Sequence, residues 1–540
     1  MKSINNLLFI FLINISLGFS QETIGLLYQE DDAYDGYTLF TPEKNNSTYL
    51  IDNCGRTINT WTFSELPGLT CYLLENGNLL RAGKTSLEIR DWDNNLVWSF
   101  DLSTQDINQH HDIEPLPNGN ILCITKEFIT TPAQENLGKN PAFIEGNLRS
   151  EKIIEIEPIG TNNMNIVWEW RFVDHLIQDF DATAPTYGVV EDHPELVDFN
   201  YEDDNMNHTD WLHINSIDYN VGLDQIIMSS KSLGEIYIID HSTTTAEASG
   251  HTGGNSGKGG DFLWRWGNPE VYRQGTTADR KLFEQHDAKW VETGYVNENQ
   301  ISVFNNFQDA AHSHSSLHLL TPELDTNNQY LLDNNSFLPN NFSWSWNGSV
   351  LEEIVVESKK CGVQSLPNGH ILFCETSIGR LTELDTEGNI VWIYRNPSGS
   401  IIHDQMTTNA EILTDNSIFR GEKYPKDYPG FIGKDVTPGH VIEDVNANSD
   451  TCITNLSVND LIPIDDTISI YNPVRNNTLR FNRTLENINY TLYSVSGSIV
   501  HETKSFSGNN IIIPNIKTGL YFMVIGIDNS KQEVIKVMVQ

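Results

Sequence analysis

The sequence predicts an all-β protein, a six-bladed β-propeller followed by a small Ig-like β-sandwich. Three observations favour this fold class: a recurring strand motif that ends in tryptophan, a second motif built on an Asn-Gly turn, and weak helical periodicity throughout. Repeated four-stranded sheets without helices between them are typical of propellers. We expect the propeller to span residues 21–445 and the sandwich to span residues 467–540.

The tryptophan motif predicts the number of blades. In each copy an alternating apolar run ends near an acidic residue, and a turn leads to a second run that carries tryptophan. The second runs include, in order, Trp61, Trp98, residues 166–170, residues 262–266, residues 344–346 and Trp392. These copies predict six blades, and we interpret most of the tryptophans as packing residues. Ring closure would pair residues 416–440 with the segment near residues 25–40, because a closed ring of sheets leaves no exposed edge.

The Asn-Gly motif predicts additional hairpins. It places Asn-Gly between two short apolar runs, at residues 74–80, 116–122 and 366–372. Asn and Gly tolerate the positive φ that tight hairpin turns require. Each copy should therefore connect two antiparallel neighbours within one blade.

A separate domain is predicted at the C-terminal end. Residues 446–466 are polar and aperiodic, as a linker would be, and no tryptophan occurs after Trp392. Short alternating runs then resume, at residues 467–471, 490–494, 499–503, 511–513, 520–525 and 534–539. Such a series of short strands indicates a small β-sandwich.

The first residues predict export. Lys2 precedes an apolar run over residues 7–17, and Gly18 and Ser20 suit the −3 and −1 positions of a cleavage site. The run is too short to span a bilayer, so we expect a signal peptide at residues 1–20 and a secreted mature chain. No later apolar stretch is long enough for stable membrane insertion.

The cysteines fit no zinc-binding spacing. There are six of them: Cys54, Cys71, Cys123, Cys361, Cys374 and Cys452. In an oxidising compartment they could form one or two disulfides, or they could be buried thiols, and the sequence leaves both open.

The charge balance excludes nucleic acid as a partner. The chain has 33 Lys and Arg against 73 Asp and Glu, a net charge of −40. No basic face could supply the counterion release on which binding to a phosphate backbone depends. Adhesion to anionic lipid is disfavoured for the same reason.

Three histidine segments are the candidate functional residues. They are residues 108–112, 210–216 and 284–290, and each carries Asp, Glu or Asn beside its histidine. If each begins an inner strand, all three would face the central channel, where propellers usually carry their functional sites. A single histidine is more often structural, but three such segments favour a shared site. They could bind zinc with an open fourth position, or they could provide a nucleophile with electrostatic partners.

A glycine-rich run over residues 253–260 superficially suggests a phosphate-binding loop. Its spacing lacks the first glycine, no Ser or Thr follows Lys258, and no βαβ context surrounds it. We therefore do not predict a nucleotide site.

Several motifs together resemble the bacterial arylsulfate sulfotransferase family over roughly residues 25–440. The motifs that carry the resemblance are residues 35–40, 210–217, 257–269, Gln285-His286-Asp287-Ala288, residues 303–306, Phe419-Arg420 and Lys423-Tyr424. The last 74 residues are similar to the C-terminal sorting domain of the type IX secretion system of Bacteroidetes. Residues 471–474, 493–497 and 518–521 carry that second resemblance.

The family resemblance implies a reaction and assigns roles. It implies a six-bladed propeller that moves a sulfuryl group from an aryl sulfate donor to a phenolic acceptor through a sulfohistidine, with no nucleotide donor and no cofactor. His286 would be the nucleophile, and His213 and Asn215 would bind the sulfuryl oxygens. His110 or His111 would complete the pocket, with His111 preferred for its neighbour Asp112.

Three further residues are expected near the substrate. The family usually has Arg where this chain has Lys231, which turns a bidentate fork into a point charge. Thr376 and Arg380 look placed for the channel, and Arg380 could supply the missing guanidinium. No residue is expected to bind a metal in this reading.

The resemblance also implies partners and a location. The sorting domain would engage the type IX secretion machinery and carry the protein through the periplasm to the cell surface or beyond.

The implied chemistry fits the residue types, because a neutral imidazole can attack sulfur and fixed donors can hold the sulfuryl oxygens. A neighbouring histidine with a pKa near the working pH would protonate the leaving phenolate. Two alternatives remain: a secreted binding propeller whose histidines are structural, and a metal-dependent hydrolase built on the same three histidines.

Overall fold

The computed structural model describes residues 23–203, 207–309, 311–405, 407–444, 474, 477–494, 498–514, 516–528 and 531–539. The expected signal peptide (1–20) and linker (446–466) lie outside the described residues. The chain divides into two compact units, residues 1–456 and 457–540, which are described separately.

Antiparallel sheets of four or five strands build the first unit. The first sheet contains β31 (Ile418–Pro425), β2 (Gly36–Pro42), β3 (Ser47–Ile51) and β4 (Thr57–Thr62), in this order. The second contains β5 (Pro67–Leu73), β6 (Leu79–Gly83), β7 (Ser86–Arg90) and β8 (Leu96–Asp101). The third contains β9 (Gln109–Pro115), β10 (Ile121–Ile129), β11 (Leu148–Ile159) and β12 (Asn163–Arg171). The fourth contains β15 (Ile214–Asn220), β16 (Gln225–Ser230), β17 (Glu235–Asp240) and β18 (Trp264–Trp266). The fifth contains β19 (His286–Trp290), β20 (Ile301–Asn305), β21 (Ser316–Leu320) and β24 (Trp344–Trp346). The sixth contains β27 (Gly362–Ser365), β28 (Ile371–Glu375), β29 (Arg380–Leu384), β30 (Ile390–Arg395) and, at its outer edge, β1 (Gly25–Gln29).

The remaining elements of this unit are short. Three strand pairs are β13 (Leu176–Ile177) with β14 (Val197–Asp198), β22 (Leu332–Asp333) with β23 (Ser336–Phe337), and β25 (Ser349–Val350) with β26 (Glu353–Ile354). The α-helices are α1 (Thr131–Asn136), α2 (Thr245–Ala248) and α3 (Asn409–Ile412). The 3-10 helices are η1 (Leu102–Gln105), η2 (Pro141–Phe143), η3 (Phe172–Asp174), η4 (Val190–Asp192), η5 (Pro269–Tyr272), η6 (Thr277–Asp279), η7 (Thr376–Ile378) and η8 (Pro429–Phe431). No helix in the described part of the chain is both long and apolar enough to cross a membrane.

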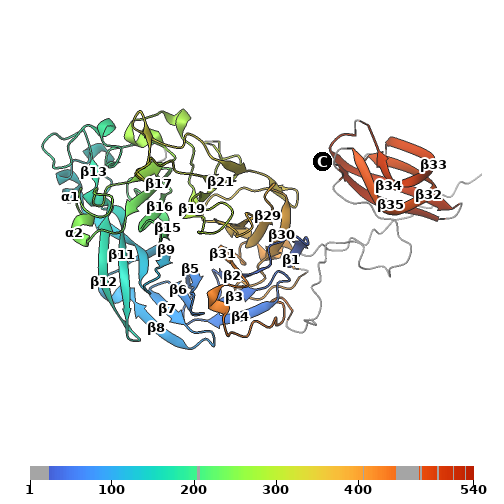
Figure 1. The fold of residues 1–540 in the computed structure, drawn as a ribbon, viewed down its shortest axis with the longest axis horizontal. Helices are drawn as coiled ribbons and strands as arrows, with labels where there is room; N and C mark the ends of the chain where they lie inside the picture. Colours follow the sequence, from blue (N-terminus) through green and yellow to red (C-terminus); the bar gives the residue numbers. More distant parts are fainter. Residues whose placement is uncertain are drawn as a thin grey trace, which may run out of the picture. The chain divides into compact units, whose positions relative to one another are not determined.

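The sheets are arranged around a centre, as in a propeller (Figure 1). The inner strands β5, β9, β15, β19, β27 and β31 contact one another in this cyclic order. The pairing of β31 with β2 joins the two ends of the unit, with Gly36 opposite Pro425. The expected pairing of residues 416–440 with the segment near 25–40 is therefore confirmed. The fold is all-β and propeller-like.

Tryptophans connect neighbouring sheets, as the sequence predicted. The indole N–H of Trp61 donates to the Asp91 carbonyl of the next sheet at 2.8 Å. Trp98 bonds in the same way to Asn163, and Trp392 to Asn53. Each indole thus buries a large apolar surface and satisfies its polar group across a sheet boundary.

The Asn-Gly hairpins form where they were expected. Gly77, Gly119 and Gly369 have φ of 81°, 88° and 86°. They lie in the turns between β5 and β6, β9 and β10, and β27 and β28. A residue with a Cβ would be strained there.

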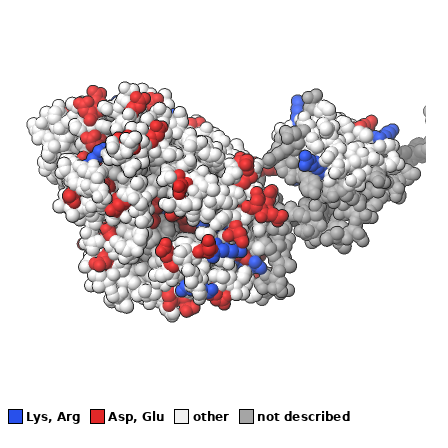
Figure 2. Space-filling view, in the orientation of Figure 1, with Lys and Arg blue, Asp and Glu red and all other residues white. Residues whose placement is uncertain are grey.

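The first unit exposes mainly acidic charge. On the face shown in Figure 2, Asp and Glu side chains are spread over the surface and basic side chains are few.

Of the cysteines, Cys71, Cys123, Cys361 and Cys374 are free and buried, whereas Cys54 is disulfide-bonded. Both of the fates left open by the sequence therefore occur.

The second unit holds one four-stranded sheet in its described residues. The order is β33 (Ile499–Ile512), β32 (Thr478–Ser494), β34 (Gly519–Asp528) and β35 (Lys531–Val539). Leu492, Met523 and Val537 are fully buried on it. The expectation of two strands at 499–503 and 511–513 is wrong, because register shifts absorb the polar residues between them and β33 continues. The expected strand at 467–471 lies outside the described residues.

Candidate active site

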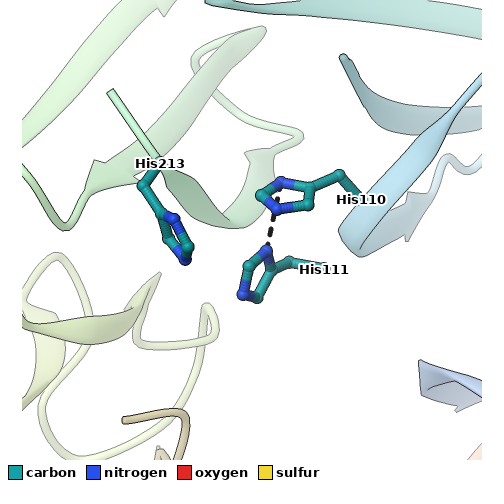
Figure 3. A group of neighbouring side chains, drawn as sticks. All are labelled: His110, His111 and His213. Atoms are coloured by element: carbon teal, nitrogen blue, oxygen red, sulfur yellow. Dashed lines mark hydrogen bonds between the residues drawn. The ribbon is translucent and has the colours of Figure 1, made fainter. Parts of the chain in front are cut away.

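The three histidine segments meet at the starts of neighbouring inner strands. His110 and His111 belong to β9, His213 precedes β15, and His286 begins β19. The ring centres of His111 lie 4.0 Å from His110, 4.9 Å from His213 and 6.3 Å from His286. Figure 3 shows the His110 and His111 rings meeting edge to face, with His213 beside them. The structure thus brings together the four histidines that the sequence selected.

Irregular backbone presents these side chains. His111, His213 and Asp287 have φ of 55°, 52° and 56°, in the left-handed region that residues with a Cβ rarely adopt. The pairings of β9 and β19 shift register across His111 and Asp287, and the pairing of β15 shifts between Ile214 and Ser216, just after His213. Left-handed backbone costs about 1–3 kcal/mol for each non-glycine residue and is concentrated at functional sites. The bulges turn the histidines out of the regular alternation of the strands.

Hydrogen bonds set the tautomer of His286. Its Nδ1 lies 2.9 Å from the Glu284 carbonyl and 2.7 Å from Asn306 Oδ1, so both neighbours are acceptors. The Asn306 amide is fixed in this orientation because its Nδ2 donates to the carbonyls of Glu357 and Lys360. Nδ1 therefore carries the proton, and the lone pair is on Nε2.

His286 is a neutral base whose Nε2 lone pair accepts one backbone hydrogen bond. Burial, more than any other cause, lowers its pKa to about 3, and nearby His213, Arg420 and Lys231 act in the same direction. The backbone N–H of Lys360 donates to Nε2 at 3.1 Å. At neutral pH the ring is thus uncharged, and its Nε2 is the atom suited to nucleophilic attack.

His213 is oriented by a carboxylate and a guanidinium. Its Nδ1 lies 2.8 Å from Asp210 Oδ2. Arg149 forms an ion pair with Asp210, and its Nη2 lies 3.2 Å from the same ring nitrogen. Arg149 comes from β11 of the preceding sheet, and nothing in the sequence near the histidines pointed to it.

His110 and His111 are also held neutral. Their Nδ1 atoms lie 3.1 Å apart, so one of them donates to the other. Burial and then the neighbouring histidines lower the pKa of His110 to about 2 and that of His111 well below its usual value. The expectation that a neighbouring histidine titrates near the working pH therefore does not hold for these two.

Arg420 ties the three histidine segments together. This buried residue of β31 donates to Asp112 Oδ2 at 2.6 Å and to the Asn215 carbonyl at 3.0 Å, and its Nε lies 3.1 Å from Asp287 Oδ1. Each of these partners follows a site histidine by one or two residues. From the sequence, Arg420 was part of a motif that carries the family resemblance, but no role was predicted for it.

Asn215 acts on its neighbours in this structure. Its Nδ2 donates to the Gln285 carbonyl at 2.7 Å, one residue before His286. This bond uses one of the two N–H groups of the amide, so Asn215 helps to position the start of β19, and its predicted contact with a sulfuryl oxygen stays a prediction.

The remaining expected residues lie in different surroundings. Lys231 Nζ is 3.0 Å from Glu284 Oε2, beside the His286 segment. The Thr376 hydroxyl oxygen accepts from the Cys361 N–H, one residue after Lys360. The Nε and Nη2 atoms of Arg380 donate to the two Glu375 oxygens, at 2.6 and 2.7 Å. The predicted contact of Arg380 with substrate stays a prediction, and the guanidiniums of Arg149 and Arg420 are the ones that lie beside the histidine segments.

A metal could be held by part of this cluster. Ligand nitrogens of His110, His111 and His213 all lie within 4.8 Å of one another, and His286 is not a member of that group. Three imidazoles with an open fourth position are a ligand set that suits zinc.

The fold and the site define a propeller-like protein with four clustered histidines, and the cations of Arg149 and Arg420 hold the segments that carry them. The family model for arylsulfotransferases (ASST) matches residues 72–397, and the chain belongs to this family. Membership supports a sulfotransferase enzyme that acts on small molecules. No curated protein matches the chain.

Solved structures resemble the chain only distantly. A protein of unknown function from Bacteroides caccae is 12% identical, with 73% of this chain and 100% of that chain covered and a TM-score of 0.38. A streptogramin B lyase is 12% identical, with coverage of 74% and 87% and a TM-score of 0.34. The β-propeller domain of Cps50 (Swd1) from Myceliophteria thermophila is 9% identical, with coverage of 70% and 88% and a TM-score of 0.34. These likenesses concern the fold alone.

Proposed function

We propose that the protein transfers a sulfuryl group from an aryl sulfate to a phenol through a sulfohistidine at His286. The observation that supports this proposal is the tautomer of His286: both acceptors lie at Nδ1, so the lone pair that would attack is on Nε2, where the Lys360 N–H now donates to it. Lowering of its pKa to about 3 keeps this nitrogen unprotonated at neutral pH.

The reaction has two half-reactions. In the first, the Nε2 lone pair forms the N–S bond while the bond from sulfur to the aryl oxygen breaks, and the phenolate leaves with that electron pair. In the second, the acceptor oxygen forms a new S–O bond, the N–S pair returns to Nε2, and the phenolic proton passes to water. The sulfuryl group thus changes oxygen without oxidation or reduction.

Donors around the cluster would hold the sulfuryl oxygens. His213 is fixed by Asp210, and Lys231 contributes a positive charge close to His286. The Lys360 N–H, at 3.1 Å from Nε2, would be released to an oxygen when the N–S bond forms. Fixed donors of this kind stabilise charge that develops in the transition state.

The assay uses a chromogenic aryl sulfate with and without a second phenol. Release that depends on the acceptor indicates transfer, and a donor-only incubation should add one sulfuryl mass, labile in acid, to the peptide that contains His286. His286→Asn should lose turnover by several orders of magnitude, whereas the exposed His193→Asn should match wild type. An adduct on His111 or His213 would permute the roles, and transfer without any adduct would refute the covalent mechanism.

A metal-dependent hydrolase is the second candidate, favoured by the convergence of His110, His111 and His213. It predicts release without an acceptor that a chelator abolishes. A binding propeller without catalysis predicts no release under either condition.

We also propose the finer architecture and route. The six sheets of the first unit would be the six blades of a closed propeller. Residues 467–540 would form an Ig-like sorting domain for the type IX machinery, and a signal peptide at 1–20 would begin export through the periplasm. Fusing residues 446–540 to a periplasmic reporter tests the sorting role: cell-surface delivery supports it, and retention in the periplasm refutes it.

A further inference from the structure

A second histidine cluster connects the segment after η3 with the glycine-rich insertion between α2 and β18. His175 follows η3, and His251 and Asp261 lie at the two ends of the insertion. One ligand atom from each residue lies within 4.8 Å of the other two. The side chains of His175, Asp261 and His251 are 0%, 9% and 61% exposed, so the cluster runs from the interior to solvent. None of these residues belongs to the candidate active site.

The partners of His175 leave one ring nitrogen facing an acceptor. Its Nε2 lies 2.9 Å from the Ala248 carbonyl, so that nitrogen carries a proton and donates it. Its Nδ1 lies 2.8 Å from Asp261 Oδ1. In the neutral ring, Nδ1 would present a lone pair to a carboxylate oxygen, which is repulsive unless a cation or a second proton lies between them.

His251 converges on the same oxygen. Its Nδ1 also lies 2.8 Å from Asp261 Oδ1. Two imidazole nitrogens and one carboxylate oxygen therefore converge. The other ring nitrogen of His175 donates its N–H to the Ala248 carbonyl, which fixes the orientation of that ring. A ring N–H anchored in this way is the usual means of orienting a histidine that ligates a metal.

The side chain of His175 is tightly packed. The Trp170 ring stacks on it at 5.2 Å between ring centres and 6° between planes. A Cβ added to Gly260 would lie 2.0 Å from the Ala248 carbonyl oxygen and 2.6 Å from His175 Nε2. Only glycine allows the insertion to approach the buried imidazole this closely.

We propose that His175, His251 and Asp261 form a zinc site that holds the glycine-rich insertion against the segment after β12. The ligands are the two Nδ1 atoms and the Asp261 carboxylate, with a water in the fourth position on the solvent side of His251. Imidazole and carboxylate ligands in this number suit Zn²⁺. The exposed His251 provides the entry path, and the site is independent of the proposed transfer reaction.

The test measures bound zinc in the full-length protein after chelator treatment and dialysis. Because His110, His111 and His213 could also bind zinc, all variants are made in a His213→Ala background. That background should bind one equivalent of added zinc chloride. Adding His251→Ala should remove this equivalent without unfolding the chain, since His251 is exposed. Adding His193→Ala, which removes an exposed histidine that also contacts a glutamate, should leave it in place.

Two further measurements keep the outcome decisive. Asp261→Asn should weaken zinc binding while keeping the size of the side chain, and zinc should slow proteolysis within the insertion only when His251 is present. Equal zinc content with and without His251 would overturn the proposal. So would an absence of bound zinc in the His213→Ala background, which would mean that His175 carries two protons and pairs with Asp261 as an imidazolium.

Discussion

At the scale of single residues, the chemistry of His286 depends on Asn306. Its amide oxygen accepts a hydrogen bond from the Nδ1–H group of His286, and its amide nitrogen donates to two backbone carbonyls. Asn306 thereby selects Nε2 as the reactive nitrogen from the opposite side of the ring. Asn306 is therefore a positioning residue.

Asn306→Ala should lower kcat for acceptor-dependent transfer by about 100-fold, because the imidazole loses both its tautomer preference and its orientation. Asn306→Asp restores an acceptor at Nδ1 and should recover part of the rate. The new carboxylate should also raise the pKa of His286, since a nearby negative charge favours the imidazolium. Both variants are compared with Asn347→Ala, an exposed amide of the same region. Wild-type kcat in Asn306→Ala would contradict the assignment.

The pH dependence of the first half-reaction reports on the same residue. Only the neutral imidazole attacks, and the pKa of His286 is lowered to about 3. We therefore expect single-turnover donor cleavage to keep its rate as the pH falls from 7 to about 4, and to be lost only below that range. A rate that is halved near pH 6.5 would show an ordinary, solvated histidine instead.

At the scale of strands, close approach at the start of β27 supports the site. The Val363 N–H donates to Asp287 Oδ2 at 2.8 Å, directly beyond Gly362. A Cβ added to Gly362 would lie 2.6 Å from that same oxygen and 2.8 Å from Arg420 Cγ. The carboxylate next to His286 and its guanidinium partner thus occupy space that only glycine leaves free.

Gly362→Ala should lower the free energy of unfolding by about 1–3 kcal/mol, as overpacking of a filled interior does. Transfer activity should fall with it, because Asp287 and Arg420 must shift. The control is Gly222→Ala in the turn after β15, where the nearest atom to an added Cβ is 3.5 Å away. Urea denaturation of both variants checks this prediction, and equal stabilities would contradict it.

The sequence predicted the strands better than their contacts. The repeated motifs identified the tryptophan strands, and the acidic or amide neighbours of the histidines identified the three histidine segments, because each of these is a local pattern. Arg149 and Asn306 come from other strands or turns, and no local signal relates them to the histidines. The ion pair of Arg380 with Glu375 could not be predicted, because it forms only when β28 and β29 pair. Local periodicity predicts elements, whereas ion pairing depends on which elements become neighbours.

At the scale of the whole molecule, the first unit depends on a strand near its C-terminal end. β31 pairs with β2 and contacts both β5 and β27. Without it, β2 would present an open edge, and Asp112 and Asp287 would lose their shared cation.

Truncation after residue 456 should leave a folded unit that retains transfer activity, because every site residue precedes that point. Truncation after residue 417 should give an unfolded or aggregating chain. Circular dichroism and turnover of the two purified fragments check this pair of expectations. A folded, active fragment ending at residue 417 would show that β31 is dispensable.

The location of Arg420 has a consequence for biosynthesis. A ribosome completes the segments that carry His111, His213 and His286 long before it reaches the arginine that binds all three of them. A nascent or stalled chain therefore holds every histidine of the cluster but lacks the cation that arranges them. Any chain that ends before residue 420, whether stalled or cleaved, should therefore lack activity.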